Sequence, residues 1–264
     1  MGKKEDSMLE ARNISYQIGN KTLLQSSNIH FHANAFHVIM GANGAGKSTL
    51  LKLLAGDISP ATGQVFFDGK ELNSYSRLQL AQRRAVLSQH YNITFPVTGG
   101  EMVLMGRYPH FNTIPSQKDL AIQLQAMQKM GVEEFYDRDY NTLSGGEAQK
   151  VQMSRVLAQV WQDNATMGKI VFLDEPVSHL DVKYQYQLLK LAKDLCAQNI
   201  TVIAILHDIN LAISFADRLI LMKQGEIKYD LPAMNQMTSG MLEDVFDMKL
   251  QLLHPEGHKP VVIF

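Results

Sequence analysis

The apolar residues of this chain are grouped in short uninterrupted runs, and stretches with helical spacing separate them. Runs of this kind occupy residues 38–40, 170–173, 201–206 and 218–222. A strand that is apolar along its whole length is typical of a parallel sheet covered by helices on both faces. The pattern therefore predicts an α/β fold with a mostly parallel sheet.

More strands are expected near the N-terminus, where the pattern changes. Residues 9–18 and 24–31 have strand composition and are joined by a Gly19-Asn20 turn, and residues 65–67 precede another turn. Glycine and asparagine favour the tight turns that connect adjacent antiparallel strands. These segments predict an antiparallel β edge subdomain beside the main sheet.

Strand patterns are missing between residues 91 and 161, and a helical insertion is expected there. Within it, Leu120, Leu124 and Met127 lie on one side of a helix predicted over residues 117–131. The chain carries no internal repeat, low-complexity tract or extended linker.

We therefore expect a single domain over residues 1–264. Its core is predicted to comprise residues 1–89, which include the β subdomain, together with residues 162–264, and residues 90–161 are predicted to form the helical subdomain. The segment from about Pro232 onward has a mixed pattern that predicts no particular element.

Charge and cysteine content narrow the partners and the compartment. The 25 Lys and Arg residues balance the 26 Asp and Glu residues, so the net charge of -1 provides no general attraction to nucleic acid or to an anionic membrane. The single cysteine, Cys196, cannot form an intramolecular disulfide, which favours a reducing cytoplasm.

Residues 1–10 are polar, unlike a secretory signal, and the longest apolar runs are far shorter than the ~20 residues that cross a bilayer. A protein without a membrane span is expected.

The most specific chemical motif follows the buried strand at residues 38–40. Residues 41–48 read Gly-Ala-Asn-Gly-Ala-Gly-Lys-Ser and satisfy G-x-x-x-x-G-K-[ST], the phosphate loop, between a strand and a helix. Backbone N–H groups and the positive end of the following helix favour phosphate oxygens at such a loop. Lys47 is expected to reach the β- and γ-phosphates of a nucleotide, and Ser48 to hold Mg²⁺. The alternative is a glycine-rich turn that matches by chance.

Two adjacent carboxylates end another buried strand. Asp174 and Glu175 follow residues 170–173, and ligands of open α/β sheets bind at the carboxyl ends of strands. Asp174 is suited to orient a magnesium ion through its water shell, and Glu175 to accept a proton from an attacking water. The alternative is that both acids cap the next helix.

A second glycine-rich helix start is predicted at residues 143–147, Leu-Ser-Gly-Gly-Glu. Ser144 and Glu147 have the spacing of a capping box. Gly145 and Gly146 leave the helix end free of bulky side chains, so this end is also suited to receive the γ-phosphate of a nucleotide held elsewhere. Spacing alone favours the capping box, and both interpretations stay open.

Taken with these motifs, the chain resembles the ATP-binding subunits of ABC transporters over nearly its whole length. Residues 143–147 are similar to the family's signature motif, Gln89 to its Q-loop glutamine, residues 178–181 to its D-loop, and His207 to its switch histidine. The phosphate loop and the two acids then correspond to its Walker A and Walker B motifs. The resemblance implies a P-loop NTPase fold of the RecA-like class, with ATP and Mg²⁺ as ligands.

The resemblance also implies the roles of particular residues. Glu175, His207 and Gln89 are the expected catalytic residues, and Ser48, Gln89 and Asp174 are expected at the metal. Tyr16 matches the aromatic residue that stacks on adenine, although packing within a sheet is an alternative for it. The expected nucleotide contacts are Tyr16, Gly41, Asn43, Gly44, Ala45, Gly46, Lys47, Ser48, Thr49, Ser144, Gly145, Gly146 and Asp181.

Within the family, the chain is most similar to importers of haem, ferric siderophores and vitamin B12. The similarity to these importers is carried by residues 83–90, 95–98 and 105–110, and residues 138–140 and 155–161 are most like bacterial haem-import ATPases. The resemblance therefore implies haem import, with ferric siderophores or vitamin B12 as alternative cargoes.

Three positions depart from the family pattern. Lys150 stands where arginine is usual, Val177 replaces threonine, and Gly99-Gly100 replaces a polar or acidic pair. The glycine pair is expected to alter a surface that faces the permease.

The resemblance implies partners and a location as well. Two copies would pair head to tail so that each ATP lies between the phosphate loop of one copy and residues 144–146 of the other, with binding closing the pair and hydrolysis reopening it. Gln89 and the surface up to His110, including Arg107, would face an integral membrane permease. A periplasmic or surface substrate-binding protein would take part indirectly, and nucleic acid would not. The chain would then lie peripherally on the cytoplasmic face of the bacterial inner membrane.

The same residues bear on two other functions. A soluble ABC-type ATPase of DNA repair or translation is disfavoured by the single ATPase unit and the lack of a basic patch. A P-loop nucleotide kinase is disfavoured by the signature stretch.

His30 and His32 alternate along a predicted strand and resemble a haem or metal pair, but further ligands are missing. The 14 methionines are expected to fill the core rather than to bind haem.

Overall fold

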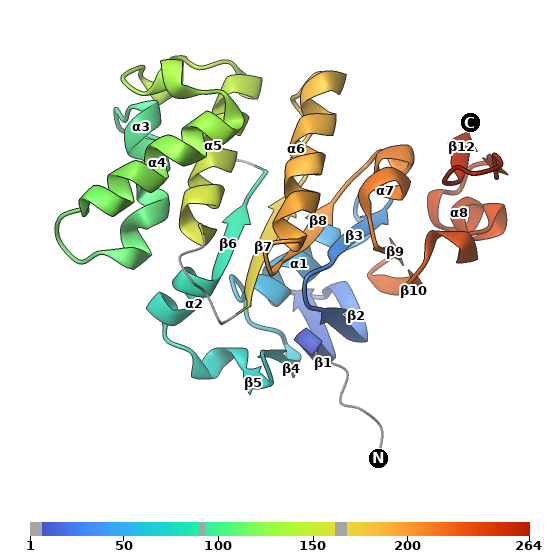
Figure 1. Ribbon diagram of the computed structural model, residues 1–264. Helices are drawn as coiled ribbons and strands as arrows, with labels where there is room; N and C mark the ends of the chain where they lie inside the picture. Colours follow the sequence, from blue (N-terminus) through green and yellow to red (C-terminus); the bar gives the residue numbers. More distant parts are fainter. Residues whose placement is uncertain (1–6, 90–92, 162–167) are drawn as a thin grey trace.

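The computed structural model describes residues 7–89, 93–161 and 168–264. The predictions for the first six residues and for His90 therefore lie outside the described residues. The described chain contains two main sheets with helices between and around them, and a small hairpin near the C-terminus (Figure 1). None of its described helices is both long and apolar enough to cross a membrane.

The larger sheet has six strands in the order β10-β9-β3-β8-β7-β6. Strands β9, β3, β8, β7 and β6 run parallel, and β10 pairs antiparallel with β9 at one edge. The uniformly apolar runs form β3, β7, β8 and β9, which confirms the predicted α/β fold with a mostly parallel sheet. The bounds are β3 (Phe36–Gly41), β6 (Arg84–Leu87), β7 (Lys169–Asp174), β8 (Ile200–Ile205), β9 (Arg218–Lys223) and β10 (Glu226–Leu231).

The second sheet is the predicted antiparallel edge. Its order is β2-β1-β4-β5, and every pairing in it is antiparallel. The turn between the first two strands falls at Gly19-Asn20, as the sequence predicts. The strands are β1 (Ser7–Ile18), β2 (Lys21–His32), β4 (Thr62–Phe67) and β5 (Lys70–Glu71).

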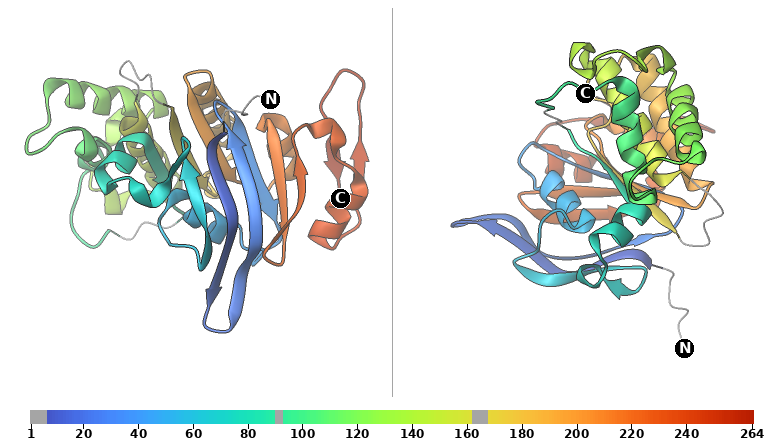
Figure 2. Two further views of the ribbon diagram at one scale, coloured as in Figure 1. Left: turned by 90° about the horizontal axis from the view of Figure 1, so that it is seen from below. Right: turned by 90° about the vertical axis from the view of Figure 1, so that its left-hand side faces the viewer.

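The parallel strands divide their side chains between two hydrophobic cores. Alternate residues of a strand point to opposite faces, so Val38 and Met40 belong to one core and Ile39 to the other. Helix α1 (Lys47–Ala55) fills the core between the two sheets (Figure 2). Helices α6 (Val182–Cys196) and α7 (Ile209–Phe215) pack into the opposite core.

Helices also gather beside the β6 edge of the larger sheet, on the left in Figure 1. The predicted helix over residues 117–131 is α4, which begins with a capping box at Ser116 and ends before Gly131. The α-helices of this group and its connections are α2 (Arg77–Arg83), α3 (Gly99–Leu104), α4 (Gln117–Met130) and α5 (Gly145–Val160). The 3-10 helices are η1 (Leu72–Ser74), η2 (Met105–His110), η3 (Glu133–Phe135) and η4 (Tyr140–Thr142).

Arg107 lies inside this group of helices and not on a docking surface, which corrects the expectation from the sequence. Its side chain donates a 3.0 Å hydrogen bond to Asp119 of α4 and a 2.8 Å bond to the carbonyl oxygen of Ala158 in α5. Both charged side chains are buried, at 4% and 6% exposure. Although burial raises it, hydrogen bonds from Ser116 and from Arg107 hold the pKa of Asp119 below its ordinary value. Arg107 therefore joins three elements from within.

The Gly99-Gly100 pair is also buried, so its effect on a permease-facing surface is not direct. A Cβ atom on Gly99 would lie 2.3 Å from the carbonyl oxygen of Phe135, and one on Gly100 would lie 2.9 Å from the ring of Tyr136. The pair permits α3 to approach η3 at a distance that larger residues exclude.

The C-terminal segment, which the sequence did not assign, folds against α7 and β9. It consists of η5 (Met234–Gln236), α8 (Ser239–Phe246) and an antiparallel hairpin of β11 (Gln251–Leu253) and β12 (Val261–Ile263). Leu242 and Val245 of α8 and Val262 of β12 are buried in the larger core.

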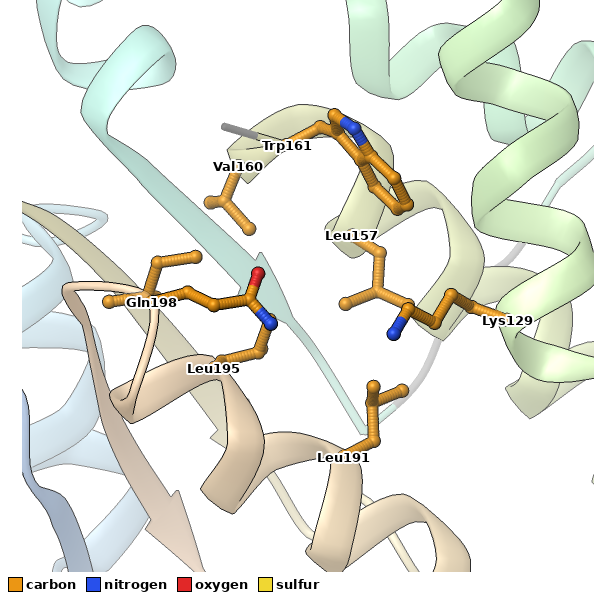
Figure 3. A pocket seen from close by; sticks show the side chains of 8 residues that line it. Lys129, Leu157, Val160, Trp161, Leu191, Leu195 and Gln198 are labelled. Atoms are coloured by element: carbon orange, nitrogen blue, oxygen red, sulfur yellow. The ribbon is translucent and has the colours of Figure 1, made fainter. Parts of the chain in front are cut away.

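A pocket of about 260 Å³ lies where the C-terminal end of α5 faces α6. Figure 3 shows that Leu157 and Trp161 border it from one side and that Leu191 and Leu195 of α6 border it from the other. The pocket therefore marks a place where the helical group meets α6.

Replacement of Arg107 by alanine is predicted to destabilise the fold by about 3–5 kcal/mol, because the carboxylate of Asp119 stays buried without its cation. Urea unfolding followed by circular dichroism measures this change. Arg12→Ala is the matched control, since Arg12 pairs with Glu10 at the surface and exposed pairs contribute little to stability. Equal free energies of unfolding for the two variants would contradict the assignment of Arg107.

Candidate active site

The phosphate loop connects β3 to α1, and its backbone is confined by its neighbours. A Cβ atom on Gly41 would lie 2.2 Å from the carbonyl oxygen of Met222, and one on Gly46, whose φ is +95°, would lie 2.5 Å from that of Leu23. The Gly225 N–H donates a 3.0 Å hydrogen bond to the carbonyl oxygen of Ala45. The β9–β10 turn and β2 therefore hold the loop in place. The remaining loop residues, Asn43 and Gly44, are exposed, and Thr49 lies half-buried on α1.

The ammonium of Lys47 is folded into this loop. It donates hydrogen bonds of 2.9 and 3.0 Å to the carbonyl oxygens of Gly41 and Ala42, and the residue is 6% exposed. Burial lowers the pKa of Lys47, while the charges of Glu175 and Asp174 act in the opposite direction. The positive charge thus lies beside the backbone that a phosphate would contact.

Ser48 and Asp174 form a pair of oxygen donors next to the loop. The Ser48 hydroxyl donates a 3.2 Å hydrogen bond to Oδ1 of Asp174 at the end of β7. Burial raises the pKa of Asp174, the bond from Ser48 lowers it, and the nearby charge of Glu175 raises it. A hard divalent cation prefers such oxygen ligands, and its charge would stabilise the buried carboxylate. The residues present therefore fit Mg²⁺.

Glu175 directs its carboxylate toward two further predicted residues. Its backbone is left-handed, with φ at +52°, which is uncommon for a residue other than glycine. Gln89 donates a 2.7 Å hydrogen bond to Oε2, and Nε2 of His207 lies 2.6 Å from Oε1. The structure thus brings together Gln89, Glu175 and His207, as the sequence predicts.

The order of the strands explains this convergence. Gln89 follows β6, Glu175 follows β7, His207 follows β8 and the phosphate loop follows β3, and these four strands are adjacent and parallel. Their carboxyl ends therefore meet at one edge of the sheet, where ligands of open α/β folds bind. The arrangement places an ammonium, a hydroxyl–carboxylate pair and a second carboxylate around one site.

Gln149 is a site residue that the sequence analysis missed. Its side-chain amide donates hydrogen bonds to the carbonyl oxygens of Glu175 and Pro176, so α5 supports the turn that carries Glu175. Gln149 and Gly145 lie on one side of α5 at i, i+4 spacing, which places it beneath the signature residues. This spacing from the signature residues is the sequence signal that could have identified Gln149.

The signature residues occupy the N-terminus of α5, where the capping box is formed. The Ser144 N–H donates to Oε2 of Glu147 at 2.7 Å, and the Glu147 N–H donates to the Ser144 hydroxyl at 3.4 Å. Cβ atoms built on Gly145 and Gly146 would approach His179 at 3.8 and 3.1 Å. Ser144 and Gly145 are exposed, and within the described parts of the chain no hydrogen bond joins them to the phosphate loop.

The other predicted site residues are placed as follows. Tyr16 is half-buried in β1 and packs against the core between the sheets. Asp181 is exposed at the N-cap of α6, where it accepts a hydrogen bond from the Tyr184 N–H. Lys150 lies over the ring of Tyr184, 3.2 Å from its centroid, and Val177 is buried. These departures from the family pattern are accommodated by packing.

The histidines of β2 do not assemble a metal site in the described residues. The rings of His30 and His32 contact each other edge to face with centroids 4.9 Å apart. Over residues 7–89, 93–161 and 168–264, no group of three or more His, Cys, Asp or Glu side chains is placed to hold a metal ion.

Comparison with known proteins agrees with this geometry. The chain matches the family described as ABC transporter over residues 24–178. It is 41% identical over 256 residues to a hemin import ATP-binding protein of Rhodopseudomonas palustris strain HaA2, which covers 97% of this chain and 96% of the relative. It is 38% identical over 257 residues to a protein of the same name from Methylobacillus flagellatus, covering 97% and 95%.

Solved structures show the same fold. An ABC transporter of metal-chelate type in an inward-facing conformation superposes with a TM-score of 0.80 at 26% identity, covering 98% of this chain and 97% of that chain. An ATP-binding cassette solved as a dimer in a post-hydrolysis state with ADP and Pi gives a TM-score of 0.74 at 26% identity, covering 84% and 97%. With a family match over more than half of its length and relatives that align along nearly all of it, this chain belongs to the ABC transporter family.

Proposed function

We propose that this chain is the ATP-hydrolysing subunit of an ABC importer and that it powers the uptake of haem through a membrane permease. The observation that carries the ATPase activity is the convergence of Lys47, the Ser48 and Asp174 pair, and the Glu175 carboxylate at one sheet edge. Haem as the cargo is supported by the names of relatives at 38% and 41% identity. Ferric siderophores and vitamin B12 are the alternative cargoes.

One group of site residues binds the phosphates of ATP, and another would bind the metal ion. The loop at residues 41–46 and the ammonium of Lys47 bind the phosphates of ATP, since backbone N–H groups and a positive charge face them. Ser48 and Asp174 would hold Mg²⁺, with Gln89 also in reach of the metal. Mg²⁺, when bound, neutralises charge on the β- and γ-phosphates.

Glu175 is the proposed general base. Its carboxylate accepts a proton from the water that attacks the γ-phosphate. Gln89 and His207 contact its two oxygens, which fixes the direction of the carboxylate before ATP is hydrolysed. His207, together with Lys47, would stabilise the charge that develops on the γ-phosphate during the attack.

A second copy of the chain is proposed to complete each site. Ser144 and Gly145 are exposed, Gly146 is partly buried, and within the described residues none of them forms a hydrogen bond with its own phosphate loop. Their helix N-terminus is therefore available to the ATP of another copy. A related cassette forms a dimer with ADP and Pi. Tyr16 is the proposed adenine contact, and Asp181 a contact across the pair.

The coupling to transport is proposed to use a moving helical subdomain. We assign residues 90–161 to this subdomain and residues 1–89 and 162–264 to the nucleotide-binding core. The pocket between α5 and α6 lies where the two parts meet, and we infer that one part rotates against the other there. Gln89 lies at the junction, where it contacts Glu175.

The permease is proposed to contact the exposed face of the helical subdomain. Tyr108 in η2 is 55% exposed and Phe95 is 52% exposed, so they replace Arg107 as candidates for this contact. The subunit would then lie peripherally on the cytoplasmic face of the bacterial inner membrane. A periplasmic or surface substrate-binding protein would deliver haem to the permease and not to this chain.

Glu175→Gln is predicted to retain ATP binding and to lower ATP hydrolysis at least about 100-fold, because the amide cannot accept the proton. With Mg-ATP the variant should accumulate as a dimer that reopens slowly. Phosphate release measures turnover, and size-exclusion chromatography with and without Mg-ATP measures the dimer. Turnover equal to that of the unaltered chain would contradict the role of Glu175.

Lys47→Ala is predicted to act at an earlier step and to weaken ATP affinity about 10- to 100-fold, since it removes hydrogen bonds to a charged group. Titration with a fluorescent ATP analogue measures the affinity. Lys52→Ala is the matched control, because Lys52 lies exposed on the same helix. An equal loss of affinity in the two variants would mean that Lys47 has no specific role.

Reconstitution with the permease in vesicles is predicted to show that haem accelerates ATP hydrolysis more than a ferric siderophore or vitamin B12 does. Tyr108→Ala should reduce this acceleration and leave hydrolysis by the chain alone unchanged. Ile18→Ala is the control, since Ile18 is 61% exposed on the other sheet. If another cargo accelerates ATP hydrolysis most, the assignment of haem as the cargo is wrong. If Tyr108→Ala retains the full acceleration, the proposed permease contact is wrong.

A further inference from the structure

The hairpin of β11 and β12 is too small to be stable by itself, and its position depends on contacts with helices. The two strands pair over Gln251, Leu252 and Leu253, with Leu252 opposite Val262. A two-stranded sheet is marginally stable in water. Leu252 and Val262 pack against the larger core, and the backbone at both outer edges of the hairpin is bound by side chains.

One of these edges is bound to α7. The side-chain amide of Asn210 donates a 3.0 Å hydrogen bond to the carbonyl oxygen of Val262, and its Oδ1 accepts a 2.8 Å bond from the Val262 N–H. Asn210 thus satisfies both backbone groups of one strand residue, as a neighbouring strand would. The contact joins residues 52 positions apart in the sequence.

The loop of the hairpin binds the other end of the same helix. The ammonium of Lys259 donates hydrogen bonds of 3.0 and 2.8 Å to the carbonyl oxygens of Ile213 and Ser214, in the last turn of α7. A cation is favourable at a helix C-terminus, where carbonyl groups have no partner within the helix. The hairpin therefore holds α7 at its first and its last turn.

The first turn of α7 is continuous with the loop that carries His207. Asp208 caps the helix by accepting hydrogen bonds from the Asn210 and Leu211 N–H groups. On its other side, the loop leaves β8, which is buried along its whole length. The loop at residues 206–208 is therefore fixed by the sheet at one end and by α7 at the other.

We propose that the C-terminal hairpin positions His207 against Glu175 through α7, and that Asn210 and Lys259 are positioning residues for ATP hydrolysis. The inference rests on the proposed function, in which His207 acts at the reacting phosphate. Helix α7 has 7 residues, too few to be stable without tertiary contacts. The hydrogen bonds from the hairpin hold it, and with it the 2.6 Å contact between His207 and Glu175.

Loss of the hydrogen bonds between the hairpin and α7 lowers turnover without removing any group from the site. A misplacement of about 1 Å in a catalytic constellation reduces the rate by up to ~100-fold, whereas ATP affinity depends on the phosphate loop, which the hairpin does not contact in the described residues. The expected signature is therefore a lower kcat at an unchanged affinity for Mg-ATP.

The experiment measures kcat, Mg-ATP affinity and thermal unfolding in the full chain for Asn210→Ala, Lys259→Ala and Lys259→Arg. Asn210→Ala and Lys259→Ala are expected to lower kcat about 10- to 100-fold. Lys259→Arg retains donors for both carbonyl oxygens and is expected to restore most of the turnover. Ser239→Ala is the matched control, since it removes the bond to Leu252 at the edge that faces away from α7. If Asn210→Ala does not fold, the two Lys259 variants carry the test.

A double-mutant cycle with His207→Ala then identifies the route of the effect. If Asn210 acts through His207, Asn210→Ala lowers kcat in the unaltered chain and has little further effect in the His207→Ala background. Equal losses in both backgrounds, or a loss in Ser239→Ala as large as in Asn210→Ala, would overturn the inference. A His207→Ala variant with full turnover would instead overturn the proposed role of His207 itself.

Discussion

The site depends on the carboxylate of Glu175 being held from both sides by the strands that flank its own. Gln89 contacts one oxygen from the end of β6 and His207 contacts the other from the end of β8, while Glu175 follows β7 between them. This contact requires three parallel strands to end in register at one sheet edge. The alternation of buried side chains fixes that register, because a slip of one residue would exchange the residues of the two cores.

The turn at Glu175 shows how the surrounding structure supports an unfavourable backbone. A left-handed conformation is costly for a glutamate, by roughly 1–3 kcal/mol, and persists only where neighbours determine it. Gln149 of α5 donates hydrogen bonds to the carbonyl oxygens at this turn, so the helix that begins with the signature residues also supports the backbone of Glu175. A shift of α5 would therefore move the backbone at Glu175 within the same chain, without any contribution from a partner.

The features that sequence predicted are those whose signal is local. The phosphate loop is a continuous motif, each buried strand is a continuous apolar run, and the capping box at Ser144 needs a spacing of three residues. Features that join distant segments left no such signal. The burial of Arg107 follows from its pairing with Asp119 and Ala158 across two helices, and the role of Gly99 follows from an approach to Phe135 that no pattern in the sequence marks. The C-terminal elements have mixed patterns because their stability comes from α7 and the core.

The amide of Asn210 has one more consequence, which concerns association between chains. An exposed strand edge presents unpaired N–H and C=O groups that can recruit another strand, and such edges promote aggregation. At Val262 both groups are already bonded to Asn210, while Ser239 accepts the N–H of Leu252 on the opposite edge. These bonds occupy backbone groups that a further strand would need. In any association between copies of the chain, they would disfavour pairing of the hairpin edges into an intermolecular sheet.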